Sequence, residues 1–385
     1  MSLLLIRHPI RKLTFEFRSR FALACRHMLH APPSSRRSKI IPFAVCAVVS
    51  LLTGAVAGRT YAQAQTGSST AWAVTLVLPP KLVAGSPATL ATLGVDGKLA
   101  AHVAVEFGNG EHVESDATGR AFFTVPSSGG FLIARASGTS VAALVDLQAA
   151  ASVPPPMTVA PVVSLRDHFS ICGGGFRGEA EADRVQINGE LALVIAASPE
   201  CLVVVPGPKA APGTTTISTK ALSGRKEATT AFVSLDFEPL NPPLTPGNKG
   251  WLILRARGSD QRLRVVVENE SPGVIHFEKS DAQELTTSGG ENNTAEIRVE
   301  AVRSGDFSFR ARLRPAPDPE TARRFLEAAV PLAPRNLQGS LKKMAVNLAR
   351  HPRDAAKVQS QLQQIVSVTM AGDFCTLLEA AQSAL

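Results

Sequence analysis

The stretch Cys172-Gly173-Gly174-Gly175-Phe176, with the apolar runs 185–187, 191–196 and 202–206 that follow it, decides the fold of this chain. Each run has the length of a short strand, and glycine, proline or an Asn-Gly pair stands between the runs. Short apolar runs divided by turn residues are typical of a small β-sandwich. Because the segments on both sides follow the same pattern, the sequence predicts a mainly β chain of several sandwiches in tandem.

The excess of basic residues lies at the N-terminus. The whole chain has 40 Lys and Arg against 32 Asp and Glu, a formal charge of +8, but ten of the bases and only one acid, Glu16, fall in residues 1–64. The remaining 30 bases and 31 acids nearly cancel. A nucleic-acid partner needs a basic surface on the folded part, so none is predicted.

Residues 1–64 have the layout of an export leader. Arg36, Arg37 and Lys39 precede an uncharged apolar run over residues 40–58, the order found in a signal peptide. The alternative is an uncleaved anchor, because the run approaches the roughly 20 residues that span a bilayer. Membrane contact is expected only through this segment. Either way, the bulk of the chain is predicted outside the cytoplasm, in the periplasm, on the cell surface or secreted.

A small-x-small site follows the apolar run. Ala62-Gln63-Ala64 fits a signal-peptidase site, and we predict cleavage before Gln65. The residues before Arg36 exceed what a signal needs, so a start at Met28 remains open as an alternative to Met1.

Residues 71–150 form the first predicted sandwich. Alternating apolar residues lead to Asp116-Ala117-Thr118-Gly119-Arg120 and a further strand. This segment resembles bacterial Ig-like and carboxypeptidase-regulatory-like repeats, in which the Asp-x-x-Gly-Arg turn is architectural. The resemblance implies a bond from Asp116 to the backbone and a left-handed Gly119. The nearby acids could instead hold calcium, but solvated strand edges explain them, and no metal or cofactor is predicted; the acids are Glu106, Glu111, Glu114 and Asp116.

Residues 157–228 form the second predicted sandwich, which contains the opening stretch. The Gly173 to Phe176 turn, the Val-Gln-Ile-Asn-Gly hairpin at 185–189 and the Ser-Pro-Glu-Cys-Leu-Val-Val-Val-Pro run at 198–206 resemble the IPT/TIG family of Ig-like domains. In such sandwiches the corresponding strands are neighbours. The resemblance therefore implies a disulfide between Cys172 and Cys201, which an oxidising compartment permits. Two buried free thiols are the alternative.

Residues 232–315 predict a third sandwich without a family resemblance. Its arginines could form a stripe for an anionic glycan or lipid headgroup, but cross-strand pairing with Glu268, Glu270 and similar acids explains them better; they are Arg255, Arg257, Arg262 and Arg264. Trp251 and Trp72 could stack on a sugar ring. A tryptophan at a strand start is more often core, and a core position is expected for both.

In residues 318–385 the spacing of the apolar residues changes to that of an amphipathic helix. Asp318 is expected to cap a helix with Pro319 at its first position, and three further amphipathic segments follow up to residue 384. Short helices need tertiary packing, so we expect a small bundle packed on the last sandwich. It serves as a structural cap or as a docking surface. Cys375 is the odd cysteine by count; it could form an intermolecular bridge, but a buried position is expected.

A catalytic site is not predicted. Cys172 has Asp167 and His168 shortly before it, but nothing in the sequence supplies an oxyanion hole or orients the imidazole. We therefore predict a non-catalytic exported binding or structural protein, with a protein or glycan partner in the cell envelope. The alternative is an accessory subunit, or a non-catalytic region, of a secreted polysaccharide- or envelope-processing enzyme system.

Overall fold

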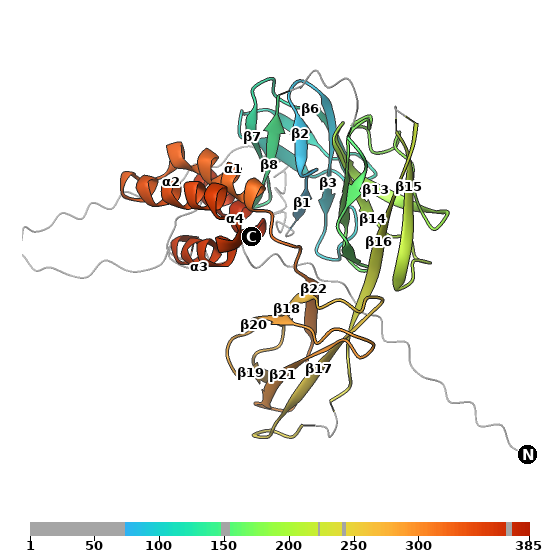
Figure 1. Cartoon of the computed structure of the whole chain (residues 1–385), viewed down its shortest axis with the longest axis vertical. Helices are drawn as coiled ribbons and strands as arrows, with labels where there is room; N and C mark the ends of the chain where they lie inside the picture. Colours follow the sequence, from blue (N-terminus) through green and yellow to red (C-terminus); the bar gives the residue numbers. More distant parts are fainter. Residues whose placement is uncertain (1–73, 148–154, 222–223, 241–243, 367–371) are drawn as a thin grey trace, which may run out of the picture.

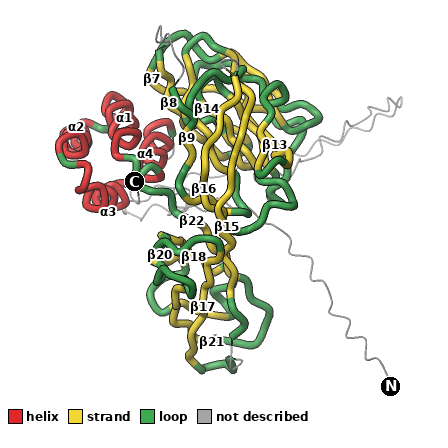
Figure 2. Tube along the Cα trace, turned by 45° about the vertical axis from the view of Figure 1, so that its right-hand side comes forward, coloured by secondary structure: helices red, strands yellow, loops and turns green. Residues whose placement is uncertain are grey.

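The structure is a computed structural model that describes residues 74–147, 155–221, 224–240, 244–366 and 372–385. It consists of tandem Ig-like β-sandwiches with a C-terminal α-helical tail, which confirms the predicted fold class. The first two sandwiches stand side by side, the third extends below them, and the helices lie beside the first (Figure 1; Figure 2). The cleavage site (Ala62, Ala64 and Gln65) and Trp72 fall outside the described residues. Within those ranges, no helix is long and apolar enough to cross a membrane.

The first sandwich has a three-stranded and a five-stranded layer. The strands of the first layer are β1 (Thr75–Val77), β3 (Pro87–Leu93) and β6 (Arg120–Thr124). Those of the second are β2 (Lys81–Val83), β8 (Thr139–Asp146), β7 (Gly130–Ala136), β4 (Ala104–Phe107) and β5 (His112–Glu114). Leu90, Phe107 and Phe123 are buried between the layers, so the alternating pattern of each strand supplies one wall of the core.

The predicted Asp116 turn closes the end of the first layer. The Asp116 carboxylate accepts hydrogen bonds from the Thr118 backbone N–H at 2.7 Å and the Arg120 backbone N–H at 3.2 Å. These bonds, with that from the Thr118 hydroxyl, lower the pKa of Asp116. Gly119 has φ +74, and a Cβ there would lie 2.7 Å from the Cβ of Leu99. The architectural interpretation of this turn is confirmed.

The second sandwich is built from β9 to β15 and the first part of β16. Its strands are β9 (Thr158–Val159), β10 (Val162–Ser164), β11 (Phe169–Cys172), β12 (Val185–Ile187), β13 (Glu190–Ala197), β14 (Cys201–Val205), β15 (Gly213–Ala221) and β16 (Gly224–Phe237). Phe169, Phe176 and Phe232 are buried in its core. β10 pairs parallel with β16, as β2 does with β8 in the first sandwich, so an early strand lies beside the last strand in both.

The predicted disulfide joins two strands of this sandwich. Cys172 and Cys201 are register partners on β11 and β14 and are disulfide-bonded, with Cα atoms 4.1 Å apart. The neighbouring turn is held by Lys226, whose Nζ donates to the carbonyl oxygens of Gly173 at 2.7 Å and Gly174 at 2.9 Å. The alternative of two free thiols is therefore wrong, and the opening glycine turn is fixed from two sides.

The third sandwich shares a strand with the second. β16 pairs with β15 along residues 224–232 and with β17 along residues 234–237. Its remaining strands are β17 (Lys249–Arg257), β18 (Arg264–Asn269), β19 (Ile275–Phe277), β20 (Ala282–Thr286), β21 (Thr294–Ala301) and β22 (Phe309–Leu313). They form the layers β19-β21-β17-β16 and β20-β18-β22 around a core of Leu254, Val267 and Phe277. No loop separates the two sandwiches where β16 runs.

The first and second sandwiches also pack tightly on one another. β3 meets β13 at Thr89 and Ala197, and the Thr89 hydroxyl donates to the Gly178 carbonyl oxygen at 2.8 Å. A Cβ on Gly178 would lie 2.2 Å from the Pro87 carbonyl oxygen, so only glycine permits this approach. Six buried apolar residues fill the contact: Val77, Ala91, Leu93, Ile195, Ala196 and Val203.

Asp183 lies buried in the segment that follows Gly178. Its carboxylate accepts a hydrogen bond from the Arg177 backbone N–H at 3.1 Å, and burial raises its pKa from 3.8 to about 6. The folded state therefore binds this proton more tightly than the unfolded chain does. Stability falls as the pH rises from 3.8 towards 6 and stays lower above it.

Asp183→Asn is expected to stabilise the protein at neutral pH, because the amide oxygen keeps the Arg177 bond without the buried charge. The free energy of unfolding should rise by about 1–3 kcal/mol near pH 7.5, with the difference shrinking towards zero near pH 4. Urea unfolding at several pH values measures this. A difference that does not change with pH would contradict the assignment.

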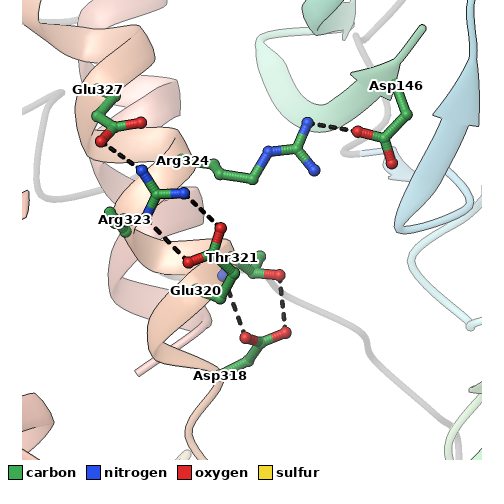
Figure 3. A network of polar contacts seen from close by, with 7 residues as sticks. All are labelled: Asp146, Asp318, Glu320, Thr321, Arg323, Arg324 and Glu327. Carbon is green, nitrogen blue, oxygen red and sulfur yellow. Dashed lines mark hydrogen bonds and ion pairs between the residues drawn. The ribbon is translucent and has the colours of Figure 1, made fainter. Parts of the chain in front are cut away.

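Four helices follow the third sandwich. They are α1 (Pro319–Ala329), α2 (Arg335–Arg350), α3 (Ala355–Val366) and α4 (Asp373–Ser383), with short turns η2 (Val330–Leu332) and η3 (Pro352–Asp354). The Asp318 carboxylate accepts from the Thr321 backbone N–H at 3.1 Å, which confirms the predicted cap (Figure 3). Arg323 bridges Glu320 and Glu327 along the same helix (Figure 3).

The expectation that this tail packs on the last sandwich is wrong, because it packs on the first. Ile133 of β7 and Leu144 of β8 belong to the same buried cluster as the apolar faces of all four helices. Arg324 of α1 pairs with Asp146 at 2.5 Å (Figure 3), and Arg135 of β7 pairs with Asp373 of α4. The physical reason is that β7 and β8 are apolar on both faces, so their outer face needs a cover.

A pair of cysteines can report this packing. The Ser140 and Thr376 hydroxyl oxygens lie 2.6 Å apart, so Ser140→Cys with Thr376→Cys, in a Cys375→Ala background, is expected to form a disulfide on mild oxidation. Non-reducing peptide mapping detects the link. Thr376→Cys combined with Ser308→Cys of the third sandwich is the control and should stay unlinked. A disulfide in the control pair and none in the Ser140→Cys, Thr376→Cys pair would mean that the tail packs on the third sandwich.

Candidate functional site on the third sandwich

The outer face of the layer β19-β21-β17-β16 is the most distinctive surface of the third sandwich. Alternation along β17 buries Leu252, Leu254 and Ala256 and turns Lys249, Trp251, Ile253 and Arg255 outward. Register pairs Trp251 with Arg298 and Lys249 with Glu300, both on β21. We call the surface formed by Lys249, Trp251, Ile253, Glu296, Arg298 and Glu300 the Trp251 face.

Trp251 is an exposed residue, so the expectation of a core position is wrong. Its surface is 51% exposed, while Leu252 beside it is 1% exposed. The guanidinium carbon of Arg298 lies 4.9 Å from the indole centroid, a cation–π contact that holds the ring in place. The sequence contained the signal, because the alternation over 249–257 places Trp251 on the same side as the basic residues.

The face carries two bases and two acids, and both bases are paired, as is the neighbouring Arg255. Lys249 Nζ lies 3.5 Å from Glu300, Arg298 Nη1 lies 3.2 Å from Glu278, and Arg255 Nε donates to Glu238 at 2.7 Å. The pairs are partly or largely exposed and contribute little to stability. Their effect is to cancel the local field, so the face carries no strong potential of either sign.

The predicted cross-strand pairing of arginines and acids is confirmed, although the partners differ in part. Arg264 of β18 pairs with Glu284 of β20, so it does not join a cationic stripe. Glu268 and Glu270 pair with two arginines of β22, the last strand: Arg312 and Arg310. The proposed stripe for an anionic glycan or lipid headgroup is not formed.

Cys172 cannot act as a thiol nucleophile, because its sulfur is in the disulfide with Cys201. His168, four residues before it, has its pKa lowered by burial, with a partial offset from Asp167. Cys375 is buried on α4, as expected, and its Sγ lies 3.4 Å from the carboxylate of Glu379, whose pKa burial raises.

The acids considered for calcium have other contacts. Glu114 lies 3.1 Å from Nδ1 of His102, and Asp116 is bound to its own turn. Across the described residues, no three or more His, Cys, Asp or Glu side chains come close enough to hold a metal ion.

A cleft of about 450 Å³ lies between the first sandwich and α4. Its lining includes Glu106, His112, Arg135, Ser140, Gly372 and Thr376. Arg135 pairs with Asp373, and Ser140 bonds to Thr376, across the junction. The polar groups here join the tail to the sandwich.

Comparisons with known proteins find no match to a family model or to a curated protein. Among solved structures, the chain is similar to SGBP-B of the Bacteroides ovatus mixed-linkage glucan utilization locus, solved with a mixed-linkage heptasaccharide (14% identity, 61% of this chain, 71% of that chain, TM-score 0.22). It is also similar to the N-terminal four Ig domains of Dscam1 isoform 6.44 (10% identity, 61% and 73% covered, TM-score 0.21).

The exposure of Trp251 predicts a contrast between two neighbouring substitutions. Trp251→Ala is expected to lower the free energy of unfolding by less than about 1 kcal/mol, because half of the side chain is already in water. Leu252→Ala, its matched control, should cost about 2–4 kcal/mol by leaving a cavity. Urea unfolding of both variants tests this. A larger loss of unfolding free energy for Trp251→Ala than for Leu252→Ala would mean that the indole is buried.

Proposed function

We propose that this chain is a non-catalytic exported binding protein that uses the Trp251 face to hold a protein or glycan of the cell envelope. The observation that carries the proposal is a half-exposed tryptophan, fixed by Arg298, on the outer face of a sheet. Exposed aromatic residues on rigid strands are frequent anchors of binding sites.

Export is part of the proposal, and the disulfide supports it. The Cys172–Cys201 bond persists only in an oxidising compartment, and the leader before Gln65 supplies the route. N-terminal sequencing of the exported protein should begin at Gln65. A start before residue 40 would mean that the segment stays as an anchor.

The second sandwich is proposed to be a domain of the IPT/TIG type. The support is the glycine turn after β11, the β12–β13 hairpin with Asn188 at φ 50 and Gly189 at φ 85, and the run through β14. In this interpretation the second sandwich is a spacer, and the rigid strand β16 holds the third at a set angle to it.

The proposal is tested with cell-envelope material from the producing cell, separated into polymer and protein fractions and immobilised. The exported chain is expected to bind one fraction without degrading it. Ile253→Glu places an unpaired charge on the Trp251 face and should weaken retention, while Leu191→Glu changes an exposed leucine of the second sandwich (63% exposed) and should not. Retention on neither fraction, or hydrolysis of an envelope polymer, would sink the proposal.

A further inference from the structure

We propose that the Trp251 face binds an uncharged polysaccharide chain, with one sugar ring stacked on the indole of Trp251. This inference rests on the proposed function and names the class of ligand for the same face. It follows from three properties of that face: an aromatic platform, cancelled charge and polar groups beside the ring.

The aromatic platform is already ordered. Half of the Trp251 surface is accessible, and the Arg298 guanidinium packs 4.9 Å from the ring centroid. Arg298 is held in turn by Glu278 at 3.2 Å. A sugar ring has one face of C–H groups, which an indole buries from water, and an ordered ring loses little rotamer freedom on binding.

The balance of charge on the Trp251 face favours uncharged polymers over charged ones. Binding of a polyanion gains from the release of its counterions by free cations. Here Lys249 is matched by Glu300 and Arg298 by Glu278, so a nucleic acid or an acidic glycan gains little. An uncharged polysaccharide does not depend on free cations for binding.

The charged groups of the Trp251 face are better suited to contact sugar hydroxyls than to be covered by a protein partner. A protein partner would remove these ion pairs from water, and desolvation of a pair often exceeds its attraction. Carboxylates and guanidinium groups keep further acceptor and donor positions after pairing. Hydroxyls of a sugar can use these positions while water remains at the rim, so Glu296, Arg298 and Lys249 serve as hydrogen-bonding neighbours of the platform.

The third sandwich carries this face on strands that lie far from the first two sandwiches. It extends beyond the paired first and second sandwiches, with β17 and β21 in its outer part (Figure 1). Outward residues along a strand repeat every ~7 Å, and Lys249, Trp251 and Ile253 form such a row on β17. A linear chain can lie along this row.

The test uses the exported full chain in affinity gel electrophoresis with soluble polysaccharides. The uncharged probes are a β-1,3-glucan, a β-1,4-glucan and a galactomannan, and alginate is the acidic probe. At least one uncharged probe should retard the protein, and Trp251→Ala should weaken this binding roughly tenfold or more, as loss of an anchor does. Trp251→Phe should keep most of it. Phe122→Ala removes a comparably exposed aromatic side chain (55% exposed) from the first sandwich and should change nothing.

Each outcome separates this inference from the proposed function. Binding that changes less than about twofold between 50 and 500 mM NaCl supports an uncharged ligand, because no counterions are released. Preference for alginate, or binding of an uncharged probe that survives Trp251→Ala, overturns the inference. If no polysaccharide binds but an envelope protein is retained and released by Ile253→Glu, the inference is wrong and the proposed function stands. Retention of nothing overturns both.

Discussion

The arrangement of this molecule depends on one strand that belongs to two sandwiches. The first part of β16 pairs with β15, and its last part pairs with β17. A strand that is hydrogen-bonded on both sides of a junction resists large bending there, because the backbone bonds of both ladders would be disturbed. Inter-domain motion is the usual expectation for domains joined by a linker. Along β16 the junction is instead part of a sheet, and it sets the direction in which the Trp251 face points.

The contact between the first two sandwiches adds a second constraint of the same kind. Thr89 and Ala197 pair across the junction, and Gly178 lets the segment after Phe176 touch the Pro87 carbonyl. Arg120 extends from the predicted Asp116 turn to the Val194 carbonyl oxygen at 2.8 Å. The turn residues that look purely local in the sequence therefore also connect two modules. With the shared strand, these contacts join the three sandwiches to one another.

Local chemistry made some features predictable and left others hidden. The cap at Asp318 and the turn at Asp116 follow from side-chain-to-backbone bonds within a few residues. The disulfide followed from a family resemblance that places β11 beside β14. The cover over Ile133 and Leu144 comes with contacts between residues 178 to 238 positions apart, which no local pattern encodes. The exposure of Trp251 follows from the alternation of its own strand, and its residue type alone predicts the opposite.

The tail on the first sandwich has a consequence for the order in which the protein assembles. Chains are synthesised from the N-terminus, so β7 and β8 emerge long before the helices that cover them. Until α1 and α4 arrive, the outer face of these strands presents Phe131, Ile133 and Leu144 to the surroundings. The first sandwich is thus the earliest to form and the last to be finished. Its completion bonds Thr376 of α4 to Ser140 of β8, next to Thr139, whose hydroxyl donates to the Val74 carbonyl oxygen at the start of the described chain.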